Sequence, residues 1–175
     1  MKILVTTASR HGWTSRVGDA VADVLRAAGH DVTRRSIDER DVVGDVVDAT
    51  GYDAVVVGGS VYTKTWLSRA TQAQELLLDR GVRVYAFAVG VLELTPDPGD
   101  PRWTAARTVE NAGERVVFGG RITRDGLSMR EKSLLAAVRA KDGEYTEWEG
   151  VEAWATGVAA DLARATPQAR PGASR

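Results

Sequence analysis

The most constraining feature of the sequence is a short, unbroken run of apolar residues in its first third. Residues 54–57 are Ala-Val-Val-Val, and Gly58-Gly59-Ser60 follows at once. A strand covered on one face alternates apolar and polar side chains, whereas a central strand of a parallel sheet is apolar throughout. The run therefore predicts a central parallel strand that ends before Gly58, with a loop at its carboxyl end.

Strand and helix patterns alternate along the rest of the chain. Strands are predicted at 3–6, 31–36, 82–89 and 115–118, and apolar residues at helical spacing predict helices at 14–28, 41–48, 68–79, 103–110, 129–141 and 148–163. This alternation favours right-handed crossovers and a three-layer α/β sandwich. We expect one domain over residues 1–164 with an insertion at about 123–145, and a disordered tail at 165–175.

Composition excludes several classes of function. The 175 residues include no cysteine and only two histidines, His11 and His30, which excludes disulfides, iron–sulfur clusters and thiol nucleophiles and predicts no metal site. With 23 basic and 24 acidic residues the formal charge is -1, so nucleic acid and anionic membranes are not expected partners. No apolar stretch approaches the ~18 residues of a membrane span, and we expect a soluble, cytoplasmic protein.

The loop after the first predicted strand is rich in hydroxyl groups and precedes a helix. It contains Ser9-Arg10-His11-Gly12-Trp13, and the helix is expected to begin at Thr14. Hydroxyls and unpaired amides at a helix N-terminus form a cradle for phosphate, because the helix dipole also favours an anion there. The alternative is ordinary N-capping by Ser9 or Thr14. The glycine motifs of P-loop NTPases and of dinucleotide-binding domains are absent after this strand.

Two further loops would lie at the same edge of the sheet, where open parallel sheets bind their ligands. The third strand leads into residues 59–66, in which Tyr62 and Trp66 offer stacking surfaces and the glycine allows close approach of a flat ligand. The fourth strand leads into residues 89–93, which would form the opposite wall. Gly58 stands where a phosphoryl-receiver domain needs an aspartate, and that alternative is excluded.

These loops resemble those of the flavodoxin-like FMN proteins. Residues 9–14 match the family pattern of hydroxyl, any residue, hydroxyl, glycine, any residue, threonine, with His11 in place of the second hydroxyl. Within this superfamily the chain most resembles the menaquinone-dependent protoporphyrinogen IX dehydrogenase (protoporphyrinogen oxidase) family of bacteria, in segments 9–16, 52–61, 119–122 and 145–149. The resemblance implies a flavodoxin-like three-layer αβα sandwich with a five-stranded parallel sheet of order 2-1-3-4-5.

The same resemblance implies an FMN site at the carboxyl edge of the sheet. The first loop would hold the phosphate, and the other two would hold the isoalloxazine ring. The implied cofactor-binding residues are Ser9, Arg10, His11, Gly12, Trp13, Thr14, Gly59, Ser60, Val61, Tyr62, Thr63, Trp66, Val89, Gly90, Val91, Leu92 and Glu93. Trp13 and Trp66 either contact the flavin or pack in the core. Because the electron chemistry belongs to the flavin, no catalytic acid or base is assigned.

Three functions are compatible with such a site. We expect an FMN-dependent oxidoreductase that passes electrons between a small organic substrate and a quinone-like acceptor. Glu93, Asp97 and Asp100 stand where the dehydrogenases carry basic residues, which argues against a dicarboxylate porphyrin as that substrate. The alternatives are a flavodoxin-type electron carrier, although such carriers tend to be strongly acidic, and a partner-binding domain with a decayed flavin site. A homo-oligomer is also possible.

The first loop gives a mutational prediction of its own. A bulky residue at Gly12 is expected to abolish FMN retention by blocking the approach of the phosphate.

Overall fold

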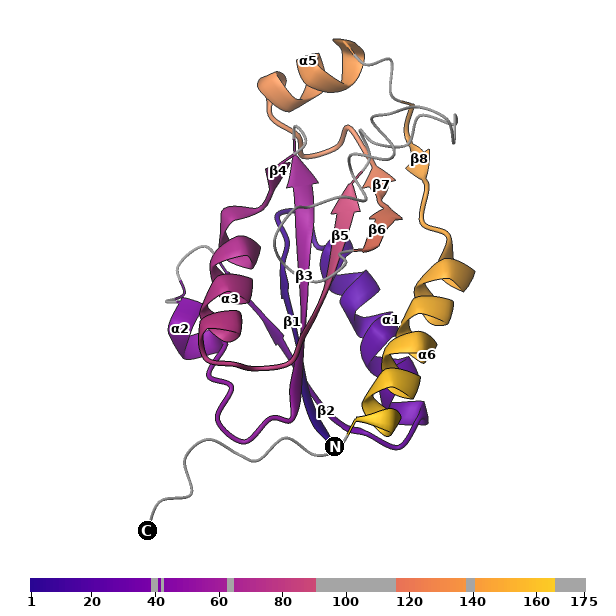
Figure 1. The fold of residues 1–175 in the computed structure, drawn as a ribbon. Helices are drawn as coiled ribbons and strands as arrows, with labels where there is room; N and C mark the ends of the chain where they lie inside the picture. Colours follow the sequence, from indigo (N-terminus) through magenta and orange to yellow (C-terminus); the bar gives the residue numbers. More distant parts are fainter. Residues whose placement is uncertain (39–40, 42, 63–64, 91–115, 138–140, 166–175) are drawn as a thin grey trace.

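In the described part of the chain, five strands form a parallel sheet with helices on both faces (Figure 1). The computed structural model describes residues 1–38, 41, 43–62, 65–90, 116–137 and 141–165. The spatial order is β2-β1-β3-β5-β6, and each neighbouring pair is parallel, which confirms the predicted sheet. The strands are β1 (Lys2–Ala8), β2 (Asp31–Ser36), β3 (Ala54–Tyr62), β5 (Val84–Gly90) and β6 (Val116–Gly119).

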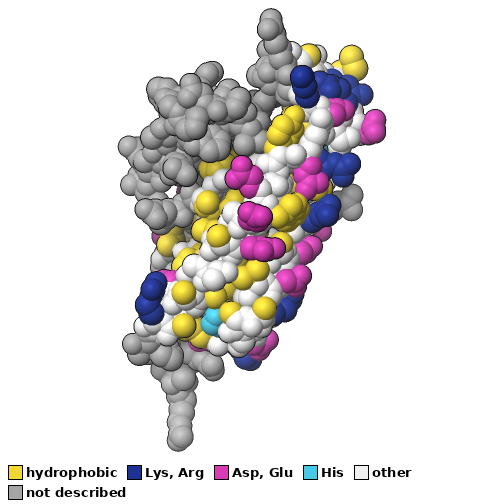
Figure 2. All heavy atoms as spheres, turned by 90° about the vertical axis from the view of Figure 1, so that its right-hand side faces the viewer, with side chains coloured by type: hydrophobic (Ala, Val, Ile, Leu, Met, Phe, Trp, Pro, Cys, Tyr) yellow, Lys and Arg dark blue, Asp and Glu magenta, His cyan; other side chains and the backbone are white. Residues whose placement is uncertain are grey.

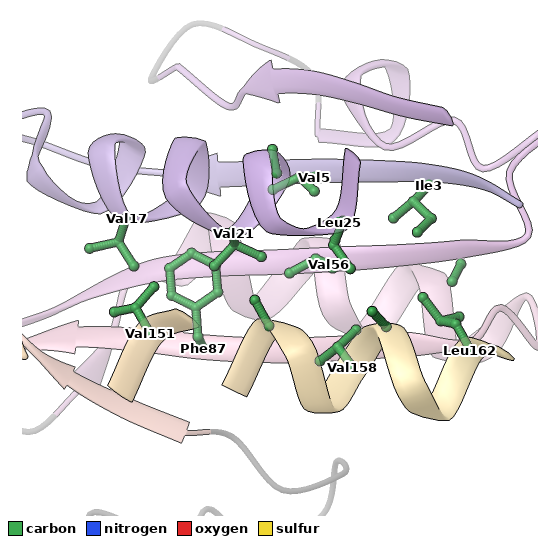
Figure 3. Close-up of a cluster of buried hydrophobic side chains, with 14 of the residues drawn as sticks. Ile3, Val5, Val17, Val21, Leu25, Val56, Phe87, Val151, Val158 and Leu162 are labelled. Atoms are coloured by element: carbon green, nitrogen blue, oxygen red, sulfur yellow. The ribbon is translucent and has the colours of Figure 1, made fainter. Parts of the chain in front are cut away.

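Two apolar cores lie on the two faces of this sheet. Helices α1 (Trp13–Ala27) and α6 (Trp148–Arg164) cover one face, and α2 (Val43–Val46) and α3 (Ser68–Asp79) cover the other (Figure 1). Figure 3 shows the first core, where side chains of α1 and α6 surround Phe87 of β5. In β1, Ile3 and Val5 belong to this core and Leu4 to the other, so both faces of the strand are buried.

The predicted helices agree with the structure to different degrees. Helices α1, α3 and α6 match the predictions for 14–28, 68–79 and 148–163 to within one residue at each end. The helix predicted at 41–48 is the single turn α2, and the one predicted at 129–141 is α5 (Met129–Ala137). The helix predicted at 103–110 lies outside the described residues.

The prediction that the central strand ends before Gly58 is wrong. Strand β3 continues to Tyr62, and its end pairs antiparallel with β4 (Thr65–Trp66). A Cβ at Gly58 would lie 2.2 Å from Cζ of Phe87, and a Cβ at Gly59 would lie 2.3 Å from Nε1 of Trp66. The two glycines therefore remain in the strand and admit one aromatic ring on each face.

A separate small sheet lies between β6 and α6, in the region of the predicted insertion. Strands β7 (Arg121–Ile122) and β8 (Gly143–Glu144) pair antiparallel, and α5 lies between them in sequence. In Figure 1, α5 stands beyond the carboxyl edge of the main sheet. Among the described residues, no helix is long and apolar enough to cross a membrane.

Candidate functional site

The carboxyl ends of β1, β3 and β5 lie side by side at one edge of the sheet. Ala8 pairs with Gly59, and Ser60 pairs with Val89. The chain leaves β1 towards α1 on one face and leaves β3 towards α3 on the other, so the connections diverge between these strands. In open parallel sheets such a point of divergence is where ligands bind.

The end of the first loop prepares the N-terminus of α1 for an anion. Gly12 has a left-handed backbone with φ of 79°, and no side-chain hydrogen bond caps this end of the helix. The predicted alternative of N-capping by Ser9 or Thr14 is therefore wrong. The first turn of α1 also contains no acidic residue. Uncapped amides at the positive end of the helix dipole favour a negatively charged group.

Two predicted site residues from different loops meet directly. Thr14 Oγ1 and Ser60 Oγ are 2.7 Å apart, and both residues are buried, with exposed fractions of 2% and 7%. In such a pair one hydroxyl donates its hydrogen to the other, so the second hydroxyl keeps its own hydrogen for a further acceptor. The pair therefore presents one buried hydroxyl donor beside the uncapped end of α1.

An arginine that sequence reasoning missed lies behind this loop. Arg34 of β2 donates from Nη2 to Thr7 Oγ1 (2.8 Å) and to the Ser15 carbonyl (2.9 Å). Burial lowers the pKa of the Arg34 guanidinium and Asp19 raises it, and an arginine stays protonated in either case. The sequence gives no signal for it, because 31–36 has the alternation of a partly exposed strand.

The side chain of Trp13 is engaged away from the strand ends. Its indole N–H donates to Thr146 Oγ1 at 2.8 Å, and Thr146 Oγ1 donates to the Gly119 carbonyl at 2.7 Å. The Trp148 ring centroid is 6.1 Å from that of Trp13, and the guanidinium of Arg16 lies 4.8 Å above the Trp13 ring. The Trp13 side chain thus joins α1 to β6 and α6, which leaves its backbone amide for the loop. Thr146 lies in segment 145–149, one of the four segments that carry the resemblance, but the sequence did not predict its contact with Trp13.

Trp66 packs in the core between β3 and α3. It is 7% exposed, and its ring lies against Gly59 and Ala70, so little of the ring faces solvent. At the end of β5, Val89 and Gly90 are buried, and a Cβ at Gly90 would lie 3.0 Å from Cβ of Val61. Residues 61 and 90 therefore form adjacent parts of one apolar strand edge.

The other predicted residues divide into two groups. Ser9 is half-buried, and Arg10 and His11 are exposed, in the loop before α1. Tyr62 is the last residue of β3. Thr63, Val91, Leu92 and Glu93 lie outside the described residues. Over the described part of the chain, no group of three or more His, Asp or Glu residues is placed to hold a metal ion.

A sequence comparison decides the family. The profile described as a flavodoxin domain matches residues 4–149, which is most of the chain. The chain belongs to the flavodoxin domain family. The cofactor of this family is FMN, and the match includes the loop before α1 and the ends of β3 and β5. The comparison with curated proteins returned no match.

Solved flavodoxins share the fold of this flavodoxin-domain protein. The flavodoxin of Streptococcus pneumoniae is 19% identical with a TM-score of 0.54, and the alignment covers 92% of this chain and 99% of that one. Oxidised flavodoxin 1 of Bacillus cereus is 11% identical with a TM-score of 0.54 and coverages of 95% and 100%. A short-chain flavodoxin associated with a bacterial microcompartment is 17% identical with a TM-score of 0.53 and coverages of 92% and 98%.

The donor groups at the carboxyl edge suit the two ends of FMN. Residues 9–16 contain three hydroxyl side chains, two arginines and no carboxylate, which suits a phosphate dianion at an uncapped helix end. The neighbouring strand ends at Val61, Val89 and Gly90 are apolar and suit a flat aromatic ring. The residues present therefore fit the cofactor that the family implies.

Proposed function

We propose that this protein binds FMN at the carboxyl edge of its sheet and acts as an FMN-dependent oxidoreductase related to the protoporphyrinogen IX dehydrogenases. Residues 9–14 and Ser60 hold the phosphate, and the segments 59–66 and 89–93 enclose the ring. The observation that carries the proposal is the buried contact between Thr14 and Ser60, which joins the uncapped first turn of α1 to the carboxyl end of β3.

The segments that resemble the dehydrogenases support the finer assignment by their positions. Segments 119–122 and 145–149 lie together, because Thr146 donates to the Gly119 carbonyl and the Tyr145 amide donates to the Gly120 carbonyl. Thr146 in turn accepts from Trp13 in segment 9–16. Three of the four resembling segments thus form one contiguous region next to the first loop.

The protein and the cofactor have separate tasks in this function. Bound FMN supplies the capacity to take up and give back electrons. The chain binds the phosphate through amides and hydroxyls, orients the ring at the apolar strand ends and limits its contact with water. Overall, a small organic substrate loses two electrons and two protons, and a quinone-like acceptor gains them and becomes a hydroquinone.

The first experiment measures FMN binding by absorption spectroscopy and equilibrium dialysis. We expect one FMN per chain, and Thr14→Val should weaken binding by about tenfold because a buried donor is lost. Thr156→Val is the control, since the Thr156 hydroxyl is exposed and donates to the Glu152 carbonyl along α6. Absence of binding at micromolar FMN would overturn the proposal in favour of a partner-binding domain.

A flavodoxin-type electron carrier is the second candidate, and the shared flavodoxin fold favours it. Charge argues against it, because a formal charge of -1 gives little steering towards a basic redox partner. Figure 2 shows acidic and basic side chains interspersed over the face formed by α1 and α6. An enzyme should reduce menadione to its hydroquinone over many turnovers with electrons from an added small organic donor, without another protein. A carrier should cycle slowly alone and accelerate only when a flavodoxin reductase is added.

A further inference from the structure

The half-buried guanidinium of Arg34 is a cationic feature that is not among the predicted site residues. Its side chain is 16% exposed, although β2 is the edge strand of the sheet. Nε donates to Asp19 Oδ1 at 2.8 Å, Nη1 donates to the Val5 and Arg35 carbonyls, and Nη2 donates to Thr7 Oγ1 and the Ser15 carbonyl. An arginine has five N–H groups, and these contacts provide five acceptors. Five acceptors for five N–H groups hold the guanidinium in one place.

The acceptors of Nη2 lie on the two sides of the first loop. Thr7 is a buried residue near the end of β1, and Ser15 belongs to the first turn of α1. Thr7 Oγ1 is also 3.2 Å from Ser15 Oγ. One guanidinium nitrogen therefore joins both flanks of residues 8–14, the segment proposed to bind the phosphate.

A glycine inside α1 leaves room for this guanidinium, although glycine is a poor helix former. Gly18 lies inside α1, where glycine is the least favourable residue apart from proline. A Cβ at this position would lie 2.8 Å from Nη2 of Arg34 and 2.7 Å from Cγ2 of Thr7. The glycine thus preserves the contact between Arg34 and Thr7.

The positive charge of Arg34 lies beside the first turn of α1, the end of a helix that disfavours a cation. The N-terminal end of α1 carries the positive end of the helix dipole and has no acidic residue in its first turn. Asp19, the counterion of Arg34, is 62% exposed, so solvent screens much of its compensation. An anion bound at the first loop would compensate the charges of the helix end and of Arg34 together.

We propose that Arg34 is the positioning residue of the first loop: it holds Thr7 and Ser15 in place and makes the site selective for a flavin that carries a phosphate. This inference rests on the proposed function, because it concerns the same FMN site. Arg34 is not assigned a contact with the cofactor. It acts through the loop, and its charge adds to the attraction for the phosphate dianion.

The test compares FMN with riboflavin, which lacks the phosphate. We expect Arg34→Gln to weaken FMN binding by about tenfold and to change riboflavin binding by less than about twofold. Arg34→Lys should weaken FMN binding by less than Arg34→Gln does, because lysine keeps the charge but not the fork of donors. Gly18→Ala should lower FMN affinity selectively, as Arg34→Gln does, because its Cβ displaces the guanidinium and Thr7.

Arg26→Gln is the matched control, since Arg26 also joins α1 to β2 through Asp23 and the Val32 carbonyl, but at the last turn of the helix. It should change neither affinity. Equal losses of FMN and riboflavin affinity in Arg34→Gln, or no loss of FMN affinity in a folded variant, would overturn the inference. If Arg34→Gln does not fold, the ratio of FMN affinity to riboflavin affinity is measured in Arg34→Lys and Gly18→Ala instead. An unchanged ratio in both of these variants would also overturn the inference. Failure of the unaltered protein to bind FMN would instead overturn the proposed function, and this inference with it.

Discussion

At Gly12 the backbone conformation decides which residues are tolerated. A left-handed conformation costs most residues about 1–2 kcal/mol, and asparagine less because its side chain bonds locally. A Cβ at Gly12 would meet nothing within 4 Å among the described residues. The sequence suggested that a side chain at residue 12 would block the approach of the phosphate. The structure gives a different reason for the glycine, which is the left-handed φ of 79°.

Gly12→Ala should lower the free energy of unfolding by about 1 kcal/mol and weaken FMN binding, and Gly12→Asn should do both to a smaller extent. Gly29→Ala is the control, since Gly29 has a φ of 87° and open space around it but follows α1 at the opposite end of the helix from Gly12. Urea denaturation and equilibrium dialysis measure the two effects. The explanation fails if Gly12→Ala and Gly29→Ala bind FMN equally well.

Within β3, two ring contacts explain glycines that would otherwise weaken a strand. The ring of Phe87 occupies the position of a side chain at Gly58, with 2.2 Å between the expected Cβ and Cζ. Gly58→Ala should therefore destabilise the protein by about 1–3 kcal/mol through overpacking. Gly157→Ala in α6, where a Cβ meets nothing within 4 Å, should instead stabilise it by up to about 1 kcal/mol. Equal midpoints of urea denaturation for the two variants would contradict this account.

A hydrogen bond across the layers ties β5 to α6. The Tyr85 hydroxyl donates to Asp161 Oδ2. Burial, with a contribution from Asp161, raises the pKa of Tyr85 to about 12, and the bond from Tyr85 lowers the pKa of Asp161. Because the pKa of Tyr85 is higher in the folded state, its contribution to stability is complete below pH 10 and is lost as the pH rises to about 12.

Between pH 10 and 12 the protein should lose more stability than the variant Tyr85→Phe. Two pKa units correspond to about 2.7 kcal/mol for a group shielded from solvent. Solvent screening at this half-buried site reduces the expected difference in stability loss between the two proteins to ~1 kcal/mol. Chemical denaturation over this pH range measures it, and the other tyrosines cancel in the comparison. Parallel stability curves for the two proteins would refute the role of Tyr85.

The elements show what the sequence could predict and what it could not. Apolar runs such as 54–57 and helical spacing in 148–163 are local signals, and they located the sheet and α6. The C-terminal end of β3 was missed because Gly58 normally marks a loop, and the contact with Phe87, which is distant in sequence, explains its place in a strand. Arg34 and Thr146 were missed for the same reason, since their partners lie 27 and 133 residues away.

At the scale of the whole molecule, FMN should stabilise the folded chain by mass action. A ligand that binds only the folded state at 100 times its dissociation constant adds about 2.7 kcal/mol to the free energy of unfolding. We expect the thermal midpoint to rise with FMN concentration and to rise less with riboflavin at equal concentration. Differential scanning calorimetry measures both series. A midpoint that is independent of FMN concentration would exclude binding to the folded state.

The bond between Trp13 and Thr146 also has a consequence for the timing of synthesis. It spans 133 residues, so the ribosome releases the first loop long before the residue that anchors its tryptophan. Until Thr146 emerges, the Trp13 side chain lacks the residue that joins it to β6. We therefore expect the flavin to load late in synthesis, and an emerging chain that stalls before residue 146 to retain less FMN than the 175-residue chain.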